Sequence, residues 1–201
     1  MMTPPKPPAF RVAFATPFFS IEETAAERPG ELPHYRLVAS DGAICLPFTP
    51  QGDVLLVRQY RHCLGRQTLE VPSGGVDGGE GCAAAAVREI AEETAHAVSG
   101  VRLLGIARPQ LNRNTQREFF MLAFDATPIP GAAPEAGIEL VRMTRGELAR
   151  AIRTGELEQP AAIGFIGLAS VKLGLDILSA PMDEIKARAE TLPKGENEHE
   201  G

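Results

Sequence analysis

The sequence lacks the long apolar run that a membrane-spanning helix would need, since no stretch of about 18 consecutive apolar residues occurs in its 201 residues. The proline-rich start, residues 1–8, lacks the apolar segment of a secretory signal. Cysteine is scarce: Cys45, Cys63 and Cys82 lie far apart without metal-ligand spacing, which indicates reduced thiols. We therefore expect no membrane association and a cytoplasmic location.

An excess of positive charge is absent as well, because the formal net charge is −6 at pH 7. General nucleic-acid binding, which draws its affinity from a basic surface, is therefore not expected. A small anionic ligand is compatible with this charge if local arginines or a divalent metal offset it. The four histidines are scattered and do not support a zinc site. Tryptophan is missing, so a base-stacking platform would have to come from Phe18, Phe19 or Tyr35, although Phe at such positions more often packs in a core.

The composition divides the chain into a main domain, an N-terminal region and two tails. Residues 1–9 are proline-rich and predict a flexible tail. Residues 188–201 are rich in Glu, Lys and Gly, with little to bury, and predict a disordered acidic tail. Between these tails we expect N-terminal strands within residues 10–40 and the main domain over residues 41–180.

Alternating apolar residues predict strands, and a 3.6-residue period predicts helices. Strands are expected at residues 10–19, 34–39, 43–48, 54–60, 101–107, 118–125 and 138–143. Helices are expected at residues 80–97, 145–154 and 161–173, the last with Pro160 as its first residue. Because strands and helices mix without strict alternation, the expected fold class is α/β of the mixed α+β kind, a mixed sheet flanked by helices.

Two turns and one long loop complete this prediction. The turn residues Asp41-Gly42 and Gln51-Gly52 separate three successive strands and indicate an antiparallel meander. Residues 126–137 are rich in Pro, Gly and Ala and predict a mobile loop.

One expected helix carries a concentration of carboxylates. Glu89 and Glu93 are four residues apart and share one face, with Glu92 one step to the side and Glu80 about two turns earlier. Like charges at this spacing repel, so a hard divalent cation such as Mg²⁺ would neutralise them. Arg88 is placed to bridge Glu80 and Glu92. Taken alone, the glutamates are also explained by a solvated helix, which is the commoner case.

The loop before this helix decides between the two interpretations. Five residues separate Gly74 from Glu80, seven separate Glu80 from Arg88, and the run continues Arg-Glu-Ile-Ala-Glu-Glu-Thr-Ala to Ala95. This pattern resembles the Nudix box, the loop–helix signature of the Nudix hydrolase family. Two positions depart from it, since Ala95 replaces the family's glycine and His96 replaces an apolar residue. Neither departure removes a carboxylate, and we expect His96 to end the helix.

The resemblance implies a Nudix-type α/β/α sandwich with a mixed sheet and a loop–helix catalytic box. The metal ligands it implies are Glu89, Glu93, Glu92, Glu80 and the backbone carbonyl of Ser73. Arg88 is implied as the orienting salt-bridge partner, so Arg88, Glu92 and Glu93 are the expected catalytic residues of the box. The implied cofactor is Mg²⁺, with Mn²⁺ as a substitute, which cancels the charge of a diphosphate and activates water.

Segments outside the box resemble the ADP-ribose pyrophosphatase branch of that family. Residues 57–61 and 69–75 carry this likeness, which makes Arg58 and Arg61 candidates for phosphate contacts, although ordinary surface arginines would fit equally well. Glu70 is a candidate either to cap a neighbouring loop or to join the metal shell.

The stretch 108–117 departs from the Ser-Pro-Gly turn that is typical of ADP-ribose enzymes. Arg113 and Arg117 are candidates there for contact with a terminal phosphate or sugar, and solvation of a strand end explains them equally well. The departure weakens the ADP-ribose assignment and leaves the hydrolase assignment unchanged.

The resemblance also implies a catalytic base on the loop before the last strand. Glu135 and Glu139 are the candidates, and Glu135 is preferred because the Pro/Gly/Ala-rich loop before it would close over a substrate. An exposed loop acid is the commoner explanation for either one. In the ADP-ribose branch, N-terminal strands from two subunits build one adenosine pocket, so residues 10–38 predict a homodimer.

The leading hypothesis is metal-dependent hydrolysis of the diphosphate bond of ADP-ribose or a related nucleotide sugar, giving a nucleoside monophosphate and a sugar phosphate. A second hypothesis keeps the metal site and changes the substrate to a nucleoside triphosphate, a dinucleotide cofactor or a coenzyme A derivative. A third, from a different class, is a binding module that senses a nucleotide without cleaving it. The complete carboxylate set argues against the third.

Overall fold

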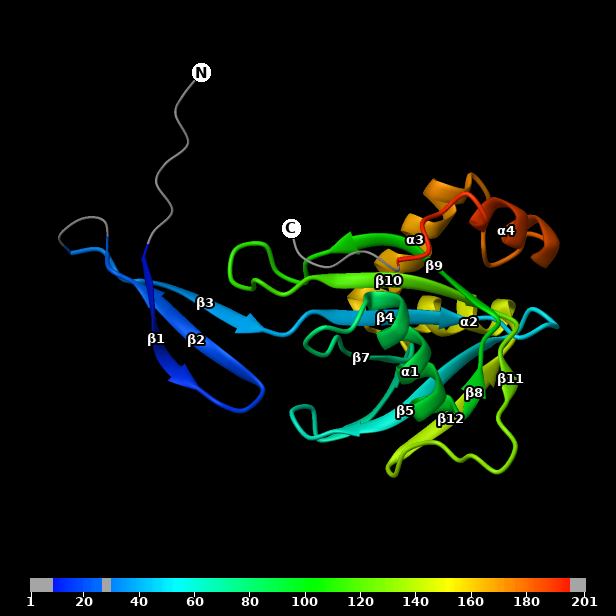
Figure 1. Ribbon diagram of the computed structural model, residues 1–201, viewed down its shortest axis with the longest axis horizontal. Helices are drawn as coiled ribbons and strands as arrows, with labels where there is room; N and C mark the ends of the chain where they lie inside the picture. The colour runs from blue at the N-terminus through cyan, green and yellow to red at the C-terminus, as the bar shows by residue number, and fades with distance from the viewer. Residues whose placement is uncertain (1–8, 27–29, 196–201) are drawn as a thin grey trace, which may run out of the picture.

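The computed structural model describes residues 9–26 and 30–195, so most of the predicted tails, residues 1–8 and 196–201, lie outside the described part. Figure 1 shows a main body of strands and helices with a small sheet that projects from one end. In chain order the elements are β1 (Phe10–Ala15), β2 (Phe19–Thr24), β3 (His34–Ala39), β4 (Gly42–Pro47), β5 (Val54–Arg61), β6 (Arg66–Glu70), β7 (Ser73–Gly75), α1 (Cys82–Thr94), β8 (His96–Ala97), β9 (Gly100–Ala107), β10 (Glu118–Phe124), β11 (Thr127–Pro128), β12 (Ile138–Met143), α2 (Arg145–Thr154), α3 (Pro160–Leu173) and α4 (Met182–Ala189).

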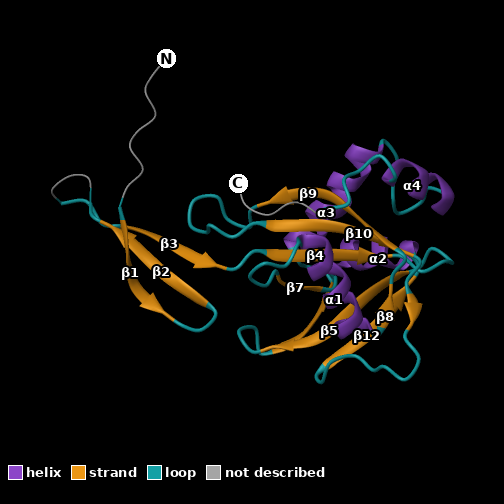
Figure 2. Cartoon of the chain, viewed as in Figure 1, coloured by secondary structure: helices purple, strands orange, loops and turns teal. Residues whose placement is uncertain are grey.

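The main body is built on a mixed sheet with the strand order β7-β4-β10-β9, in which β4 and β10 are parallel and their outer neighbours are antiparallel. A second sheet, β12-β5-β6, is antiparallel. Helix α1 contacts strands of both sheets, and Figure 2 shows it in front of the strands with α2 and α3 behind them. The predicted mixed α/β fold is therefore confirmed. Among the described residues, no helix has the length and apolarity needed to cross a membrane.

Alternation along β10 divides the core into two layers. Phe119, Met121 and Ala123 face α1, whose buried alanines leave room for the helix to lie close to the sheet. Phe120 and Leu122 face the opposite way and pack in the larger cluster with α2, α3 and α4. The run of alanines that helps to predict the helix is thus also what seats it against the strands.

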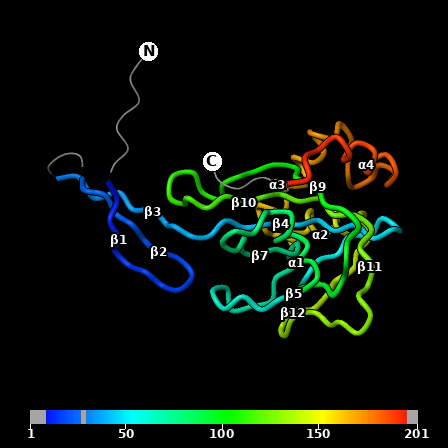
Figure 3. The backbone as a smooth tube through the Cα atoms, in the orientation of Figure 1, coloured from blue at the N-terminus to red at the C-terminus, as the bar shows by residue number. Residues whose placement is uncertain are grey.

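The predicted meander is wrong in its pairing, although its strands are correctly placed. β3 pairs with β2, whereas β4 lies between β7 and β10, so Asp41-Gly42 joins two different sheets and makes no hairpin. Figure 3 traces this passage from the projecting sheet into the main body. The second turn is present, with Gly52 at a φ of +87°, but β4 and β5 belong to different sheets, and an isolated antiparallel bridge joins Phe48 to Val54 across the turn. Burial against distant strands overrides the local turn signal here.

The C-terminal region holds more structure than the prediction of a disordered tail from residue 188 allows. α4 continues through Ala189, which is buried against the core. Beyond it, the amide of Leu103 on β9 donates a 2.7 Å hydrogen bond to the carbonyl of Pro193. The thiol of Cys82, at the start of α1, lies 3.3 Å from the carbonyl oxygen of Gly195. This C-terminal segment, residues 190–195, therefore packs on β9 and on the start of the carboxylate helix.

Ala95 ends α1 in a left-handed conformation, with a φ of 56°, and its amide donates to the carbonyl of Ala91 at 3.0 Å. This is the position where the Nudix signature carries glycine, which adopts a positive φ without a steric cost. We predict that Ala95→Gly stabilises the protein by roughly 0.5–1 kcal/mol, because relief of strain outweighs the added freedom of the unfolded chain. Thermal unfolding measures this, and a lower melting temperature would contradict it.

Candidate active site

The carboxylates of the box gather on one side of α1, where the helix faces the loop that precedes it. Glu89 and Glu93 are buried, with 9% and 5% of their surface exposed, whereas the side chain of Glu92 is 51% exposed. Glu80 lies in the loop before the helix, because α1 begins at Cys82 and not at residue 80 as predicted. The helix also ends earlier than predicted, at Thr94, and His96 lies in β8 beyond it.

Arg88 contacts three of these four carboxylates. Its Nε and Nη2 donate to the two oxygens of Glu80 at 3.1 and 2.9 Å. Its Nη1 donates to Glu89 at 2.6 Å and to Glu92 at 3.1 Å, and Nη2 also reaches the carbonyl of Gly75 at 2.8 Å. The predicted bridge from Arg88 to Glu80 and Glu92 is present, and Glu89 joins it. One guanidinium therefore holds three side chains and the loop backbone in a single arrangement.

Gly74 leaves the space that the Glu89 carboxylate occupies. A Cβ atom at position 74 would fall on the Glu89 carboxylate, well inside van der Waals contact, whereas a Cβ on the next residue, Gly75, would meet nothing within 4 Å. The first glycine of the box is thus required by the close approach of the glutamate. Its backbone φ, by contrast, is not in the left-handed region.

Glu93 contacts the start of β7, where its Oε2 accepts a 2.9 Å hydrogen bond from the backbone N–H of Ser73. Burial raises the pKa of Glu93 to about 7, the Ser73 hydrogen bond opposes that shift, and the charge of Glu89 adds to it. Burial likewise raises the pKa of Glu89, against the opposing effect of Arg88. Two buried acids side by side, both with raised pKa values, are a site that gains from an added positive charge.

The donor set at this site fits a hard divalent cation. Carboxylate oxygens and a backbone carbonyl are the ligands that Mg²⁺ and Mn²⁺ prefer. In the described part of the chain, however, no three His, Cys, Asp or Glu side chains already converge as a metal cluster. The reason is visible in the contacts: Arg88 holds Glu89 and Glu92, while Glu93 is turned to the Ser73 amide. For these carboxylates to hold one cation together, they would have to rotate towards one another.

The raised pKa of Glu93 gives metal binding a pH dependence of defined sign. Below about pH 7 the carboxyl is protonated, so a divalent metal bound by Glu93 would have to displace the proton, and its affinity should then fall by about tenfold per pH unit. Above pH 7 the affinity should level off. Without metal, the stability of the fold depends on pH in the opposite direction. The pKa of Glu93 is higher in the folded state than in the unfolded state, so Glu93 stabilises the fold at low pH, and this contribution is lost as the pH rises through about 7. Calorimetric titration of the protein with Mg²⁺ at several pH values between 6 and 8 tests the predicted change in metal affinity. An affinity that does not change over that range would contradict the prediction.

The two arginines predicted to contact phosphate point to opposite faces of β5, as residues three apart in a strand must. Arg61 shares a face with Glu70, to which it donates two hydrogen bonds at 2.8 and 2.5 Å. This pair lies near Glu93, since Arg61 lowers and Glu70 raises the pKa of that carboxyl. Arg58 points away and pairs with Glu156 at 3.0 Å. The structure therefore brings Arg61 to the carboxylates and does not bring Arg58 there.

Glu70 is paired with Arg61 and also accepts a 2.6 Å hydrogen bond from the hydroxyl of Thr68. These contacts match neither of the two roles considered for Glu70, because they neither cap a loop nor leave the carboxylate free to bind a metal. Sequence reasoning missed the Thr68–Glu70–Arg61 chain, although the alternation of residues along β6 places Thr68 and Glu70 on one face.

The loop before β12 is anchored along the C-terminal end of α1. β11 pairs with β8, the amide of Ile129 donates to the carbonyl of Ala95 at 2.9 Å, and the amide of Glu135 donates to the carbonyl of Glu92 at 2.8 Å. The side chain of Glu135 is exposed beside the carboxylate helix, and Glu139 is exposed on β12. Backbone contacts therefore hold a segment whose composition predicts a mobile loop.

Two arginines of the 108–117 stretch, Arg113 and Arg117, contact residues at the junction with the projecting sheet. Arg113 donates to the carbonyl of Tyr35 at 3.3 Å, and its own carbonyl accepts from the amide of Leu37 at 2.6 Å. Arg117 forms a two-atom ion pair with Asp41, at 2.8 and 2.6 Å. Asp41 also accepts, through its carbonyl, from the amide of Val76 in the box loop at 2.8 Å. Sequence reasoning missed this tie because Asp41 had been assigned to a turn.

Comparison with known proteins agrees with this geometry. The profile of the NUDIX domain matches residues 39–159. Among curated proteins, putative nudix hydrolase 2 of Caenorhabditis elegans is 49% identical over 47 residues, which cover 23% of this chain and about a fifth of that protein's length (21%). Among solved structures, an ADP compounds hydrolase superposes with a TM-score of 0.68 at 16% identity, covering 86% of this chain and 97% of that one.

The fold and the box define one class of protein: a mixed α/β sandwich with a loop–helix carboxylate site. Because the NUDIX profile covers more than half of the sequence, the chain belongs to the Nudix hydrolase family. The solved structure shows that the overall fold is shared as well. The resemblance stated from the sequence is therefore confirmed for both family and fold.

Proposed function

We propose that the protein is a metal-dependent pyrophosphohydrolase that cleaves the diphosphate bond of a nucleoside diphosphate linked to another group. ADP-ribose or a related nucleotide sugar is the first candidate, and the products are then a nucleoside monophosphate and a sugar phosphate. The observation that carries the proposal is the box itself, in which Arg88 positions three carboxylates beside the buried Glu93.

Glu89 and Glu93 are the principal metal ligands in this proposal, and Glu92, Glu80 and the backbone carbonyl of Ser73 assist. Mg²⁺ is the expected ion, with Mn²⁺ as a substitute, and when bound it supplies charge neutralisation for the diphosphate and an activated water. Arg88 orients the carboxylates. Arg61 contributes a fixed guanidinium at the edge of the site, held by Glu70, and such a group binds phosphate oxygens in pairs.

The substrate class rests on two observations. One is the shared fold with a protein described as an ADP compounds hydrolase. The other is a cavity of about 380 Å³ that is lined by Arg61 and Glu70, by the ion-paired Arg66 and Glu158, and by apolar groups such as Leu64 and Pro160. A cavity of this size, with both arginines and apolar groups in its walls, suits a nucleoside or sugar attached to a diphosphate.

A substrate panel with Mg²⁺, scored for released monophosphates, tests the proposed function. ADP-ribose should give the highest kcat/KM, and chelation of the metal should abolish turnover. If a nucleoside triphosphate, a dinucleotide cofactor or a coenzyme A derivative is the better substrate, the ADP-ribose assignment is wrong and the hydrolase assignment holds. Tight ADP-ribose binding without turnover at any metal concentration would instead identify a nucleotide sensor.

Glu135 is the proposed catalytic base, because its backbone is bonded to the carbonyl of Glu92 and its side chain is free to reach a substrate. We predict that Glu135→Gln lowers kcat by on the order of 10²-fold while KM changes little, as expected for loss of general base catalysis. Glu139→Gln on the neighbouring strand is the matched control and should retain activity. Equal activity of both variants would remove Glu135 from the mechanism.

We also propose that the active form is a homodimer joined through the projecting sheet β1-β2-β3. Val12, Phe14 and Phe18 expose 58%, 58% and 83% of their surface, an apolar area that a monomer would leave in water. Arg113 lies at the base of this sheet and would reach a substrate bound between the subunits. Light scattering of the full chain should report the mass of two subunits, and a monomer at working concentration would contradict the proposal.

A further inference from the structure

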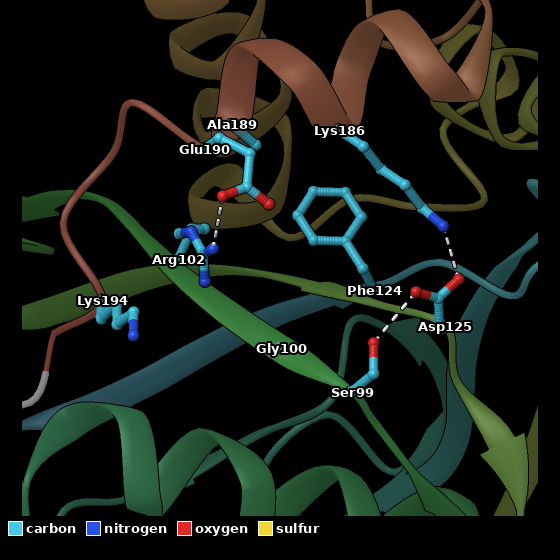
Figure 4. Close-up of a pocket in the computed structure, with 9 residues that line it drawn as sticks. All are labelled: Ser99, Gly100, Arg102, Phe124, Asp125, Lys186, Ala189, Glu190 and Lys194. Atoms are coloured by element: carbon cyan, nitrogen blue, oxygen red, sulfur yellow. Dashed lines mark hydrogen bonds and ion pairs between the residues drawn. The ribbon is translucent and has the colours of Figure 1, made fainter.

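A second cavity, of about 270 Å³, lies on the face of the central sheet opposite α1. α4 covers one side of it, the adjoining ends of β9 and β10 form the other, and the C-terminal segment closes one end (Figure 4). Arg102 of β9 is paired in register with Leu122 and so points to this face, away from the box glutamates. The cavity is therefore separate from the candidate active site.

Among the charged side chains of this cavity that form ion pairs, Arg102 is the least exposed. Its side chain is 15% exposed, and its Nη2 donates to the carboxylate of Glu190 at 3.1 Å. Glu190 itself is 72% exposed and stands at the end of α4. The Nη1 of Arg102 also donates to the carbonyl of Val101 at 2.9 Å. Ion pairs with a solvated partner are weak, so an incoming anion can replace Glu190 at the guanidinium.

On the opposite wall of the cavity, contacts with Asp125 hold Lys186 and Ser99 in place. Lys186 of α4 binds one oxygen of Asp125, and the hydroxyl of Ser99 donates to the other at 2.9 Å. Asp125 has a φ of 56°, in the left-handed region that residues other than glycine adopt infrequently. These contacts fix the ammonium of Lys186 at the edge of the cavity.

Lys194 supplies the third cation, from the C-terminal segment. Within the described part of the chain it forms no ion pair or hydrogen bond, and its side chain is exposed. The cavity is thus lined by three cationic and two anionic side chains, in a protein whose formal net charge is −6. A local excess of positive charge inside an acidic protein concentrates small anions.

We propose that this cavity binds a phosphoryl anion, either inorganic phosphate or the phosphate group of a small phosphomonoester. Arg102 takes two phosphate oxygens in place of Glu190, Lys194 folds over the anion, and Lys186 stabilises it from the α4 side. The volume of the cavity suits a phosphate with a small attached group, and Phe124, 7% exposed, offers little ring surface for a base. The proposal does not depend on the proposed function.

A phosphate bound in this cavity would add a link between the C-terminal segment and the central sheet. The segment that carries Lys194 bonds to Leu103 through Pro193 and to Cys82 through Gly195. A phosphate bridging Lys194 and Arg102 adds a further link, so binding should raise the melting temperature.

Calorimetric titration of the full chain with inorganic phosphate, in the presence of a chelator, tests the proposal. Without divalent metal the box carboxylates repel phosphate, which disfavours binding at the candidate active site, and the following variants assign any saturable binding to the second cavity. Lys194→Ala should weaken binding by about tenfold, and Arg102→Met should weaken it further. Lys172→Ala on α3 is the matched control, because it removes the same charge at an exposed site outside the cavity, and it should bind as the unaltered chain does.

The comparison of ligands identifies the occupant. Tighter binding of ribose 5-phosphate than of inorganic phosphate supports a phosphomonoester, and equal binding supports inorganic phosphate. No saturable binding, or equal binding by the Lys194→Ala and Lys172→Ala variants, would overturn the proposal. Thermal melting of each variant shows that it is folded, and Lys194→Ala, an exposed substitution, decides the outcome if Arg102→Met is unstable.

Discussion

Glu93→Gln should lower kcat by on the order of 10²–10³-fold and leave the fold intact, which is the cost of losing one strong electrostatic contact in a closed site. The amide has the shape of the carboxylate, and its oxygen can still accept the hydrogen bond from the Ser73 amide. What is lost is the negative charge of a proposed metal ligand. Because that charge is buried and unfavourable without a metal, the metal-free variant should melt at the same temperature as the unaltered protein or higher at pH 8.

The effect of Mg²⁺ on the melting temperature, together with turnover, separates a role of Glu93 in metal binding from a structural role. Added Mg²⁺ should raise the melting temperature of the unaltered chain and have a much smaller effect on Glu93→Gln. Glu184→Gln, on the exposed face of α4 and far from the box, is the control and should behave as the unaltered chain does. Near-normal turnover of Glu93→Gln would refute the metal assignment.

Gly74→Ala is expected to be nearly as damaging to activity while costing little stability. The added methyl group needs the volume that the Glu89 carboxylate fills, and the glutamate, as the end of a flexible side chain, is what must move. A displacement of about 1 Å in a positioned catalytic group costs on the order of 10²-fold in rate. The loss should appear in kcat and in metal affinity, because Glu89 is a proposed ligand that also binds Arg88.

Gly75→Ala provides a closely matched control. It makes the same change one residue later, at a backbone position of ordinary φ with nothing within 4 Å of the added atom. If Gly75→Ala loses as much activity as Gly74→Ala, the loss comes from stiffening the loop, and the steric account of Gly74 is wrong.

The elements of the fold were predictable where the signal is local. Apolar alternation placed β4, β5 and β10, and the alanine-rich period placed α1, because these patterns depend on neighbours within one element. Pairing was not predictable in this way. β4 lies beside β10, whose residues are more than 70 positions later in the chain, and the Asp41-Gly42 signal favoured a hairpin that does not form. α4 was missed because it buries few residues, among them Ile185 and Ala189.

In the candidate site, too, the features that are local in sequence were predictable and the contacts between strands were not. The carboxylates were predictable because the box is a loop and a helix contiguous in sequence, so spacing alone puts Glu89 and Glu93 on one face. The partners from other strands were not. Alternation could have shown that Arg58 and Arg61 point apart, whereas the pairing of Arg61 with Glu70 depends on the register of the β5–β6 hairpin.

The contacts of Arg88 have an evolutionary consequence. Because one guanidinium binds Glu80, Glu89 and Glu92 together, a substitution at any of the four changes the surroundings of the other three. Their mutational effects should be strongly non-additive, as they are for residues in one ion-pair network. In a background that lacks Arg88, a substitution at Glu80 should therefore cost less than it does in the unaltered chain, and we expect these four positions to vary together among relatives of the chain.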